Sequence, residues 1–142
     1  MSTRSRIGIK NPDGTITSIY CHYDGRANGI ILQDHYNSEE RARALIALGD
    51  ISLLDAKLEP EAGQAHSFDH RAEGVTVAYG RDRGEKGTEA KTSKDEDAYY
   101  DLGADSWAEC LYLWDGDCWR ELMTEGIFHG DEKRGKIQKE AA

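Results

Sequence analysis

Residues 6–23 read RIGIKNPDGTITSIYCHY, and this segment sets the architecture of the chain. Polar and apolar residues alternate along its first five positions, and Asn11-Pro12-Asp13-Gly14 is a typical turn sequence. The residues from Thr15 to Tyr23 are rich in β-branched and aromatic side chains, which favour a strand. The segment therefore predicts a β-hairpin.

The two faces of the second strand differ in character, because side chains alternate along a strand. Ile19 and Cys21 lie on the slightly more apolar face, which we expect to pack on the core. Tyr20 and His22 lie on the opposite face, which we expect to be more accessible. This second face is the first candidate for a functional surface.

Two helices are expected after the hairpin. Residues 30–36 show helical spacing of their larger side chains. Ser38 is a favourable N-cap for a second helix, because Glu39 and Glu40 follow it at the positive end of the helix dipole. Gly49 supplies a stop signal for that helix.

The second half of the chain predicts a short strand at residues 75–79 and a second hairpin at residues 108–122, rich in aromatic side chains. Residues 80–97 are densely charged and contain no large apolar side chain. We expect them to form a mobile loop unless a ligand or a partner subunit orders them. The charged residues 130–142 predict a disordered tail.

These elements describe one α+β domain at residues 1–129, with an antiparallel sheet of about five strands and two or three helices. A chain of 142 residues is long enough to bury an independent core. No segment reaches the roughly 20 apolar residues of a membrane helix, and residues 1–10 lack the apolar core of a signal peptide. We therefore expect a cytosolic protein with no membrane contact.

The charge of the chain is unevenly distributed. The net charge of −9 opposes binding to long nucleic acids, because their affinity depends mainly on Lys and Arg side chains. Residues 1–27 nevertheless carry four basic residues against two acidic ones. This local excess of positive charge is compatible with a compact anionic ligand.

Short motifs in the N-terminal quarter resemble those of a widespread group of small bacteriophage proteins. They are Thr3-Arg4-Ser5, then Tyr20-Cys21-His22-Tyr23-Asp24-Gly25, then His35-Tyr36, and residues 45–51 and 74–84 are also similar. This group is in turn similar to the phage anti-CBASS sponge proteins, which bind cyclic dinucleotide immune signals of the bacterial host and sequester them without cleavage.

The resemblance implies a homo-oligomer in the host cytoplasm that binds a cyclic dinucleotide or related nucleotide signal at or near subunit interfaces, with no cofactor. The chain departs from the pattern around the Asp-Gly pair. Where the group usually has Trp and then Tyr-Pro, this chain has Tyr23 and Arg26-Ala27. We expect the exchanged aromatic ring to alter which base is stacked. We expect the added arginine to alter which phosphate of the ligand is bound.

The candidate binding residues combine guanidinium groups, which suit phosphates, with aromatic rings, which stack on bases. Two of the arginines share one strand parity, and two others belong to the charged loop and could close over a ligand. Within the motif, His22 is assigned to phosphate or ribose and Asp24 to a base edge or a ribose hydroxyl. The full set is Arg4, Arg6, Tyr20, His22, Tyr23, Asp24, Arg26, Tyr36, Arg81 and Arg83.

Each of these residues also has a structural interpretation. The arginines can pair with the abundant carboxylates, the Tyr and His side chains can lie at the margin of the core, and Asp24 can form an Asx-turn before Gly25. Trp107, Trp114 and Trp119 are assigned to the core or to an interface rather than to a ligand.

Two other functions stay open at this stage. One is a phosphodiesterase that uses His22, Asp24 or His35, and the other is an acidic interaction protein that inhibits a host defence enzyme. The spacing of these histidines matches no zinc pattern, and the chain has no GxSxG, Walker or Rossmann motif. We therefore assign no catalytic residue and no metal ligand.

Overall fold

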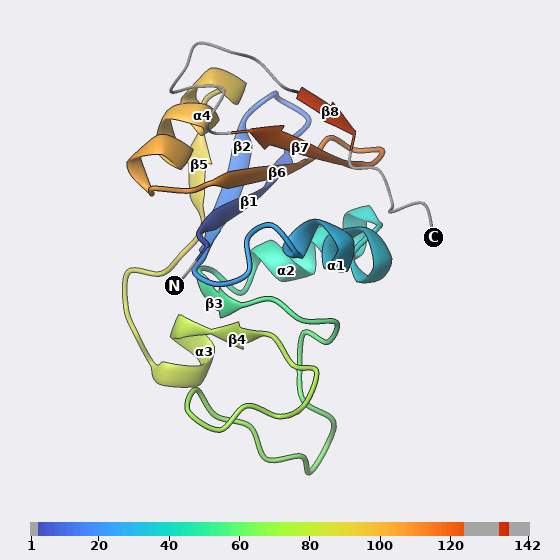
Figure 1. The fold of residues 1–142 in the computed structure, drawn as a ribbon, viewed down its shortest axis with the longest axis vertical. Coiled ribbons are helices and arrows are strands. Elements are labelled where there is room, and N and C mark those ends of the chain that lie inside the picture. Colours follow the sequence, from blue (N-terminus) through green and yellow to red (C-terminus); the bar gives the residue numbers. More distant parts are fainter. Residues whose placement is uncertain (1–2, 124–133, 137–142) are drawn as a thin grey trace.

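Residues 3–123 and 134–136 are described in the computed structural model of the chain, which is a single α+β domain built on one mixed sheet (Figure 1). The strands are β1 (Ser5–Lys10), β2 (Ile16–Cys21), β3 (Ile51–Leu53), β4 (Val77–Ala78), β5 (Lys91–Ser93), β6 (Cys110–Trp114), β7 (Trp119–Met123) and β8 (Arg134–Lys136). The helices are α1 (Asn28–His35), α2 (Glu39–Ile46), α3 (Tyr79–Arg83) and α4 (Glu96–Asp105).

The expected first hairpin is confirmed. β1 and β2 pair antiparallel from Ser5 opposite Cys21 to Lys10 opposite Ile16. Gly14 closes the turn with a φ of 90°, a conformation that glycine adopts without steric cost. The second hairpin is confirmed as well, with β6 and β7 in antiparallel register.

The sheet is not antiparallel throughout, and it has more strands than expected. Its order is β4-β3-β2-β1-β6-β7-β8, and β5 pairs with β2 outside this path. β1 pairs parallel with β6, and β2 pairs parallel with β3. The parallel pairing arises because α4 returns the chain to the end at which β1 begins, where the amide of Glu109 donates to the carbonyl of Arg4 at 2.8 Å.

The two expected helices are confirmed, and two more are present. Ser38 caps α2, since its Oγ accepts the amide of Arg41 at 3.1 Å. α4 begins in the same way, with the Asp95 carboxylate accepting the amide of Ala98 at 2.8 Å. The sequence did not predict α4, because the first turn of this helix lies in the acidic end of the segment that was expected to be a loop.

Both faces of the central strands are covered. On one face Ile7, Ile9, Ile19 and Cys21 pack with the apolar side chains of α1 and α2. On the other face Ile16 packs with Tyr99 and Tyr100 of α4 and with Leu111 and Leu113 of β6. α4 covers only part of this second face, and in Figure 1 it lies well apart from α3, with the first residues of β1 between them.

The segment at residues 80–97, which the sequence predicts as a mobile loop, contains regular structure. α3 ends within this segment, β5 pairs with β2, and α4 starts at Glu96. The segment is anchored to the sheet where the amide of Asp50 donates to the carbonyl of Thr88 at 2.7 Å. Of the tail 130–142, Arg134–Lys136 form β8 and pair with β7, and the other tail residues lie outside the described part.

A pair of glycine substitutions tests the packing of this segment. Gly49 and Gly87 share a φ of 78°, so alanine carries a similar backbone penalty of about 1–2 kcal/mol at either position. A Cβ at Gly49 would also collide with the carbonyl of Thr88, whereas a Cβ at Gly87 would meet nothing within 4 Å. We expect Gly49→Ala to lower the free energy of unfolding clearly more than Gly87→Ala in urea denaturation. Equal losses would show that residues 88–89 do not pack on the end of α2.

Candidate functional site

The candidate site lies on the part of the second sheet face that α4 leaves uncovered. It consists of Arg4, Tyr20, His22, Tyr23, Phe68, Tyr79 and Arg83, which we call the Tyr20 surface. These residues come from the start of β1, the end of β2 and the region around α3. β3 joins the two parts, because the amide of Tyr23 donates to the carbonyl of Ser52 at 3.0 Å.

Tyr20, His22 and Tyr23 form a continuous row of rings. The Tyr20 hydroxyl lies 2.8 Å from Nδ1 of His22, and the His22 and Tyr23 rings meet edge to face with centroids 4.6 Å apart. Tyr23 is 44% exposed. The row therefore presents aromatic surface to solvent while its polar atoms are partly paired.

Arg4 supplies positive charge to this row. Within the part of the chain that the structure describes, Arg4 makes no ion pair with a carboxylate. Burial raises the pKa of Tyr20, and Arg4 opposes this shift by its charge and by a hydrogen bond to the hydroxyl. Burial lowers the pKa of His22, and the charge of Arg4 lowers it further. Arg4 thus acts electrostatically on both polar side chains of the row.

A second basic and aromatic group lies beside this row. The guanidinium carbon of Arg83 is 4.3 Å from the ring centroid of Phe68 and 5.0 Å from that of Tyr79. The two rings are 5.5 Å apart, and the Tyr79 hydroxyl is hydrogen-bonded to the side chain of Ser52. Tyr79 lies close enough to Tyr20 to raise the pKa of Tyr20, and Tyr23 lies close enough to Tyr79 to raise the pKa of Tyr79.

The sequence analysis did not name Phe68 or Tyr79 as site residues. The sequence does indicate Tyr79 as a candidate, because it ends the predicted strand at residues 75–79 and lies two and four residues before the two candidate arginines. Phe68 had no such signal, since it lies in a segment with no clear periodicity. Only the packing of the segment after β3 brings it to Tyr79.

Arg6 has the strand parity expected of it but is buried under α4. Its Nε and Nη2 donate to Oγ and the carbonyl oxygen of Ser18 at 3.1 and 3.2 Å, and its Nη1 donates to Oγ of Ser106 at 3.3 Å. Burial lowers the pKa of its guanidinium, and the charge of nearby Asp50 opposes this. Arg6 therefore joins α4 to the hairpin, and Arg4 alone of the pair faces the Tyr20 surface.

Tyr36 belongs to the core on the opposite sheet face. Its hydroxyl donates to the carbonyl of Asp55 at 2.5 Å, and the guanidinium of Arg41 covers its ring at 4.9 Å. Asp24 and Arg26 lie at the exposed turn after β2, where Arg26 makes a 3.4 Å ion pair with Glu109. Asp24 has a φ of 58°, and its carbonyl accepts the amides of Ala27 and Asn28.

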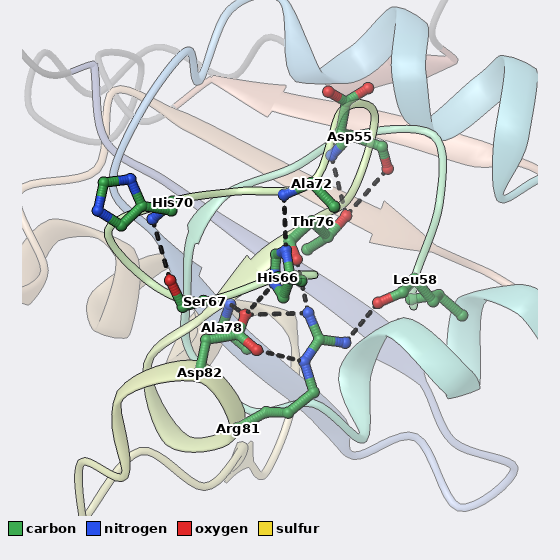
Figure 2. A network of polar contacts seen from close by, with 10 residues as sticks. All are labelled: Asp55, Leu58, His66, Ser67, His70, Ala72, Thr76, Ala78, Arg81 and Asp82. Carbon is green, nitrogen blue, oxygen red and sulfur yellow. Dashed lines mark hydrogen bonds and ion pairs between the residues drawn. The ribbon is translucent and has the colours of Figure 1, made fainter. Parts of the chain in front are cut away.

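Arg81 is engaged in a network of polar contacts that includes no residue of the Tyr20 surface (Figure 2). It donates to the carbonyls of Leu58 and Thr76 and makes a 2.8 Å ion pair with Asp82. Asp82 also accepts the amide of Ala78 at 2.8 Å and faces Nε2 of His66 at 3.0 Å. We call Arg81, Asp82 and His66 the polar clamp, because together they tie the excursion between β3 and β4 to α3.

The polar clamp keeps the Asp82 carboxylate ionised. Burial alone would raise the pKa of Asp82, but the hydrogen bonds from Arg81 and Ala78, together with the nearby Nε2 of His66, outweigh it and lower the pKa to about 2. His66 is itself held by Nδ1, which accepts the amide of Ala72 at 3.0 Å. The side chains of the clamp hold the chain in place, so the clamp is structural.

A groove of about 430 Å³ on the α2 side of the sheet is the main competing location. Its charged lining side chains are Arg43 and Glu89. Arg43 is engaged by Glu39 at 2.7 Å and by Asn11 at 3.2 Å. The groove has no aromatic lining, so it offers a nucleotide no ring on which a base could stack.

Residues 3–123 and 134–136 bring no three His, Cys, Asp or Glu side chains together in a way that could hold a metal ion. Burial raises the pKa of the Cys21 thiol to about 12 and that of the Cys110 thiol to about 11, so neither is a ready nucleophile. Among the same residues, no helix has both the length and the apolar character needed to cross a membrane.

Comparisons of the chain with protein-family models, with curated proteins and with solved structures find no match. The proposed function therefore rests on the residues of the Tyr20 surface and on the sequence motifs.

The acid stability of the polar clamp is the first test of this description. A pKa of about 2, against 3.8 ordinarily, means that the Asp82 carboxylate contributes stability above about pH 4 and loses it as the pH falls toward 2. The shift corresponds to about 2 kcal/mol. When the free energy of unfolding is measured in urea from pH 6 to pH 2, Asp82→Asn should remove the part of its pH dependence that comes from the Asp82 carboxylate. Asp69→Asn, at an exposed position in the same excursion, should keep it. If the free energy of unfolding of Asp82→Asn fell with pH in parallel with that of the unaltered protein, the role of Asp82 in the polar clamp would be contradicted.

The electrostatic link between Arg4 and His22 gives a second test. We expect an NMR titration to place the pKa of His22 below 6.5, and Arg4→Gln should raise it toward that value because one of the two causes of the shift is removed. Arg26→Gln, which removes the exposed arginine paired with Glu109, should leave the pKa of His22 unchanged. The same pKa in the Arg4 variant and the unaltered protein would remove Arg4 from the Tyr20 surface.

Proposed function

We propose that the protein binds and sequesters a cyclic dinucleotide or related cyclic nucleotide signal without cleaving it. The observation that carries the proposal is the Tyr20 surface, where two guanidinium groups lie among several aromatic rings. Arginine donates paired hydrogen bonds to phosphate oxygens, and tyrosine and phenylalanine rings stack on bases. A ligand with both planar bases and phosphates uses both kinds of group.

The charge distribution favours a small ligand over a polymer. Arg4 and Arg83 supply two cations on a surface of a chain whose net charge is −9. Arg83 also pairs with Glu85 at 2.6 Å, whereas Arg4 makes no ion pair within the described residues. A cyclic dinucleotide has two phosphates, whereas stable binding to a long nucleic acid draws on many more phosphate contacts. We assign Tyr20, Tyr23 and Tyr79 to base stacking, and His22 to a hydrogen bond with phosphate or ribose.

The proposal of sequestration rather than hydrolysis is supported by the separation of the candidate acid–base residues. His22 lies on the Tyr20 surface, whereas His35 ends α1, which packs on the opposite face of the sheet. Asp24 uses its backbone to start the turn before α1. A phosphodiesterase needs its acid, its base and the scissile phosphate within hydrogen-bond reach of one another.

The resemblance of the N-terminal motifs to the phage anti-CBASS sponge proteins supports the same proposal. Of these motifs, Arg4 and the Tyr20 to Tyr23 stretch supply four members of the Tyr20 surface. The proposal accordingly includes action in the host cytoplasm against an immune signal and assembly as a homo-oligomer. Arg26, which is part of the departure from the group pattern, lies in the exposed turn after Tyr23 and is assigned to ligand preference.

A depletion experiment separates sequestration from the alternatives. The protein is incubated with cyclic di-AMP, cyclic di-GMP and a panel of mixed cyclic di- and trinucleotides, the free nucleotide is measured, and the sample is then heat-denatured. Sequestration predicts depletion followed by release of intact nucleotide on heating. Linear product would indicate a phosphodiesterase, and no depletion for any nucleotide would contradict both and favour the acidic interaction protein.

Matched arginine variants locate the binding surface. Charge-assisted hydrogen bonds contribute about 1.5–3 kcal/mol each. Arg4→Gln and Arg83→Gln should therefore each lower the affinity for the retained nucleotide at least about tenfold, as measured by isothermal titration calorimetry. Arg43→Gln, at the groove on the α2 side, should leave the affinity within about twofold. The reverse order of effects would place the ligand in the groove.

A further inference from the structure

Trp107 combines two features that are unusual for a tryptophan. Its side chain is 74% exposed, whereas Trp114 and Trp119 are buried in the core as expected. Its φ is 59°, in the left-handed region that bulky side chains rarely adopt. Trp107 therefore does not belong to the core of this chain, and both features call for a physical explanation.

The backbone at Trp107 is set by the way α4 ends. The amide of Trp107 donates to the carbonyl of Ala104, and the amide of Ala108 donates to the carbonyl of Gly103, both at 3.0 Å. These two bonds make a Schellman motif, in which the left-handed position is usually glycine. A tryptophan here strains the backbone, and its exposed ring gains little from burial in return.

The neighbours of Trp107 place it beside the Tyr20 surface. The preceding residue, Ser106, accepts a hydrogen bond from Arg6 of β1. Two residues after Trp107, the amide of Glu109 donates to the carbonyl of Arg4 at 2.8 Å. Trp107 is thus held between two contacts to the start of β1, next to the residue that supplies one of the two cations of the site.

We infer that Trp107 is a stacking platform for a base of the bound nucleotide, and this inference rests on the proposed function. Strained residues kept in place by the surrounding structure are typical of ligand sites. A cyclic dinucleotide carries two bases, one on each side of its phosphate ring. The Tyr20 surface stacks one base, and Trp107 stacks the other, which we take to be a purine because its larger ring system covers more of the indole.

The glycine variant of Trp107 tests this without endangering the fold. Trp107→Gly restores the residue that a Schellman motif favours, so its melting temperature should equal or exceed that of the unaltered protein. Stacking of one base on an aromatic ring predicts that this variant weakens binding of the retained cyclic nucleotide roughly 5- to 150-fold. Trp107→Phe keeps a ring and should lose less.

Fluorescence gives an independent readout of the contact. A purine stacked on Trp107 should quench its emission, while the buried Trp114 and Trp119 should change little. Addition of cyclic di-AMP or cyclic di-GMP, whichever is retained, should therefore quench the unaltered protein, and the quenching should be lost in Trp107→Gly.

The outcomes separate this inference from the function on which it rests. Unchanged affinity of Trp107→Gly for a nucleotide that the unaltered protein retains would overturn the role of Trp107 and leave sequestration standing. A change in oligomeric state of Trp107→Gly with unchanged affinity would also overturn it, in favour of a contact with a second copy of the chain. No binding of any nucleotide by the unaltered protein would overturn both.

Discussion

β1 is buried on both faces, and this burial determines where the helices and the other strands can lie. β1 lies between β2 and β6, and Ile7 and Ile9 pack against α1 and α2 on one side. On the other side Gly8 has no side chain, and a Cβ there would be 3.0 Å from the Tyr99 ring of α4. Tyr99 also donates a 2.7 Å hydrogen bond to the carbonyl of Tyr112 in β6. This close approach fixes α4 over one end of the hairpin and leaves the other end to the Tyr20 surface.

The same constraint gives neighbouring residues different roles. Arg6 lies where α4 crosses the hairpin, so its guanidinium is used for internal hydrogen bonds, whereas Arg4 lies beyond the helix and remains available to a ligand. α4 ends at this boundary in a motif that holds Trp107 in a strained, exposed conformation. The candidate site is therefore the region where the second layer of the domain stops. Its cations and rings are positioned by β1, β2 and α3.

Local sequence signals were sufficient for the elements that depend on local physics. The Asn-Pro-Asp-Gly turn, the Ser38 cap and the aromatic second hairpin each carry their own signal and are confirmed. The parallel pairing of β1 with β6 was not predictable, because it depends on a connection through α4 whose charged first turn resembles a loop. For the candidate site, strand parity predicted that Tyr20 and His22 share one face, and the structure joins the Tyr20 hydroxyl to Nδ1 of His22 at 2.8 Å. Parity could not show that a helix covers Arg6, and the roles of Tyr36 and Arg81 depend on contacts with segments distant in the sequence.

We expect a cyclic nucleotide to bind where α4 leaves the β1–β2 hairpin uncovered. Chemical-shift mapping of the isotope-labelled protein with the retained nucleotide locates the binding surface residue by residue. The largest shifts should fall at Arg4, in residues 20–23, around Tyr79 and Arg83, and at Trp107, with little change in α2. Shifts centred on Arg43 and Glu89 in the groove on the α2 side would contradict it.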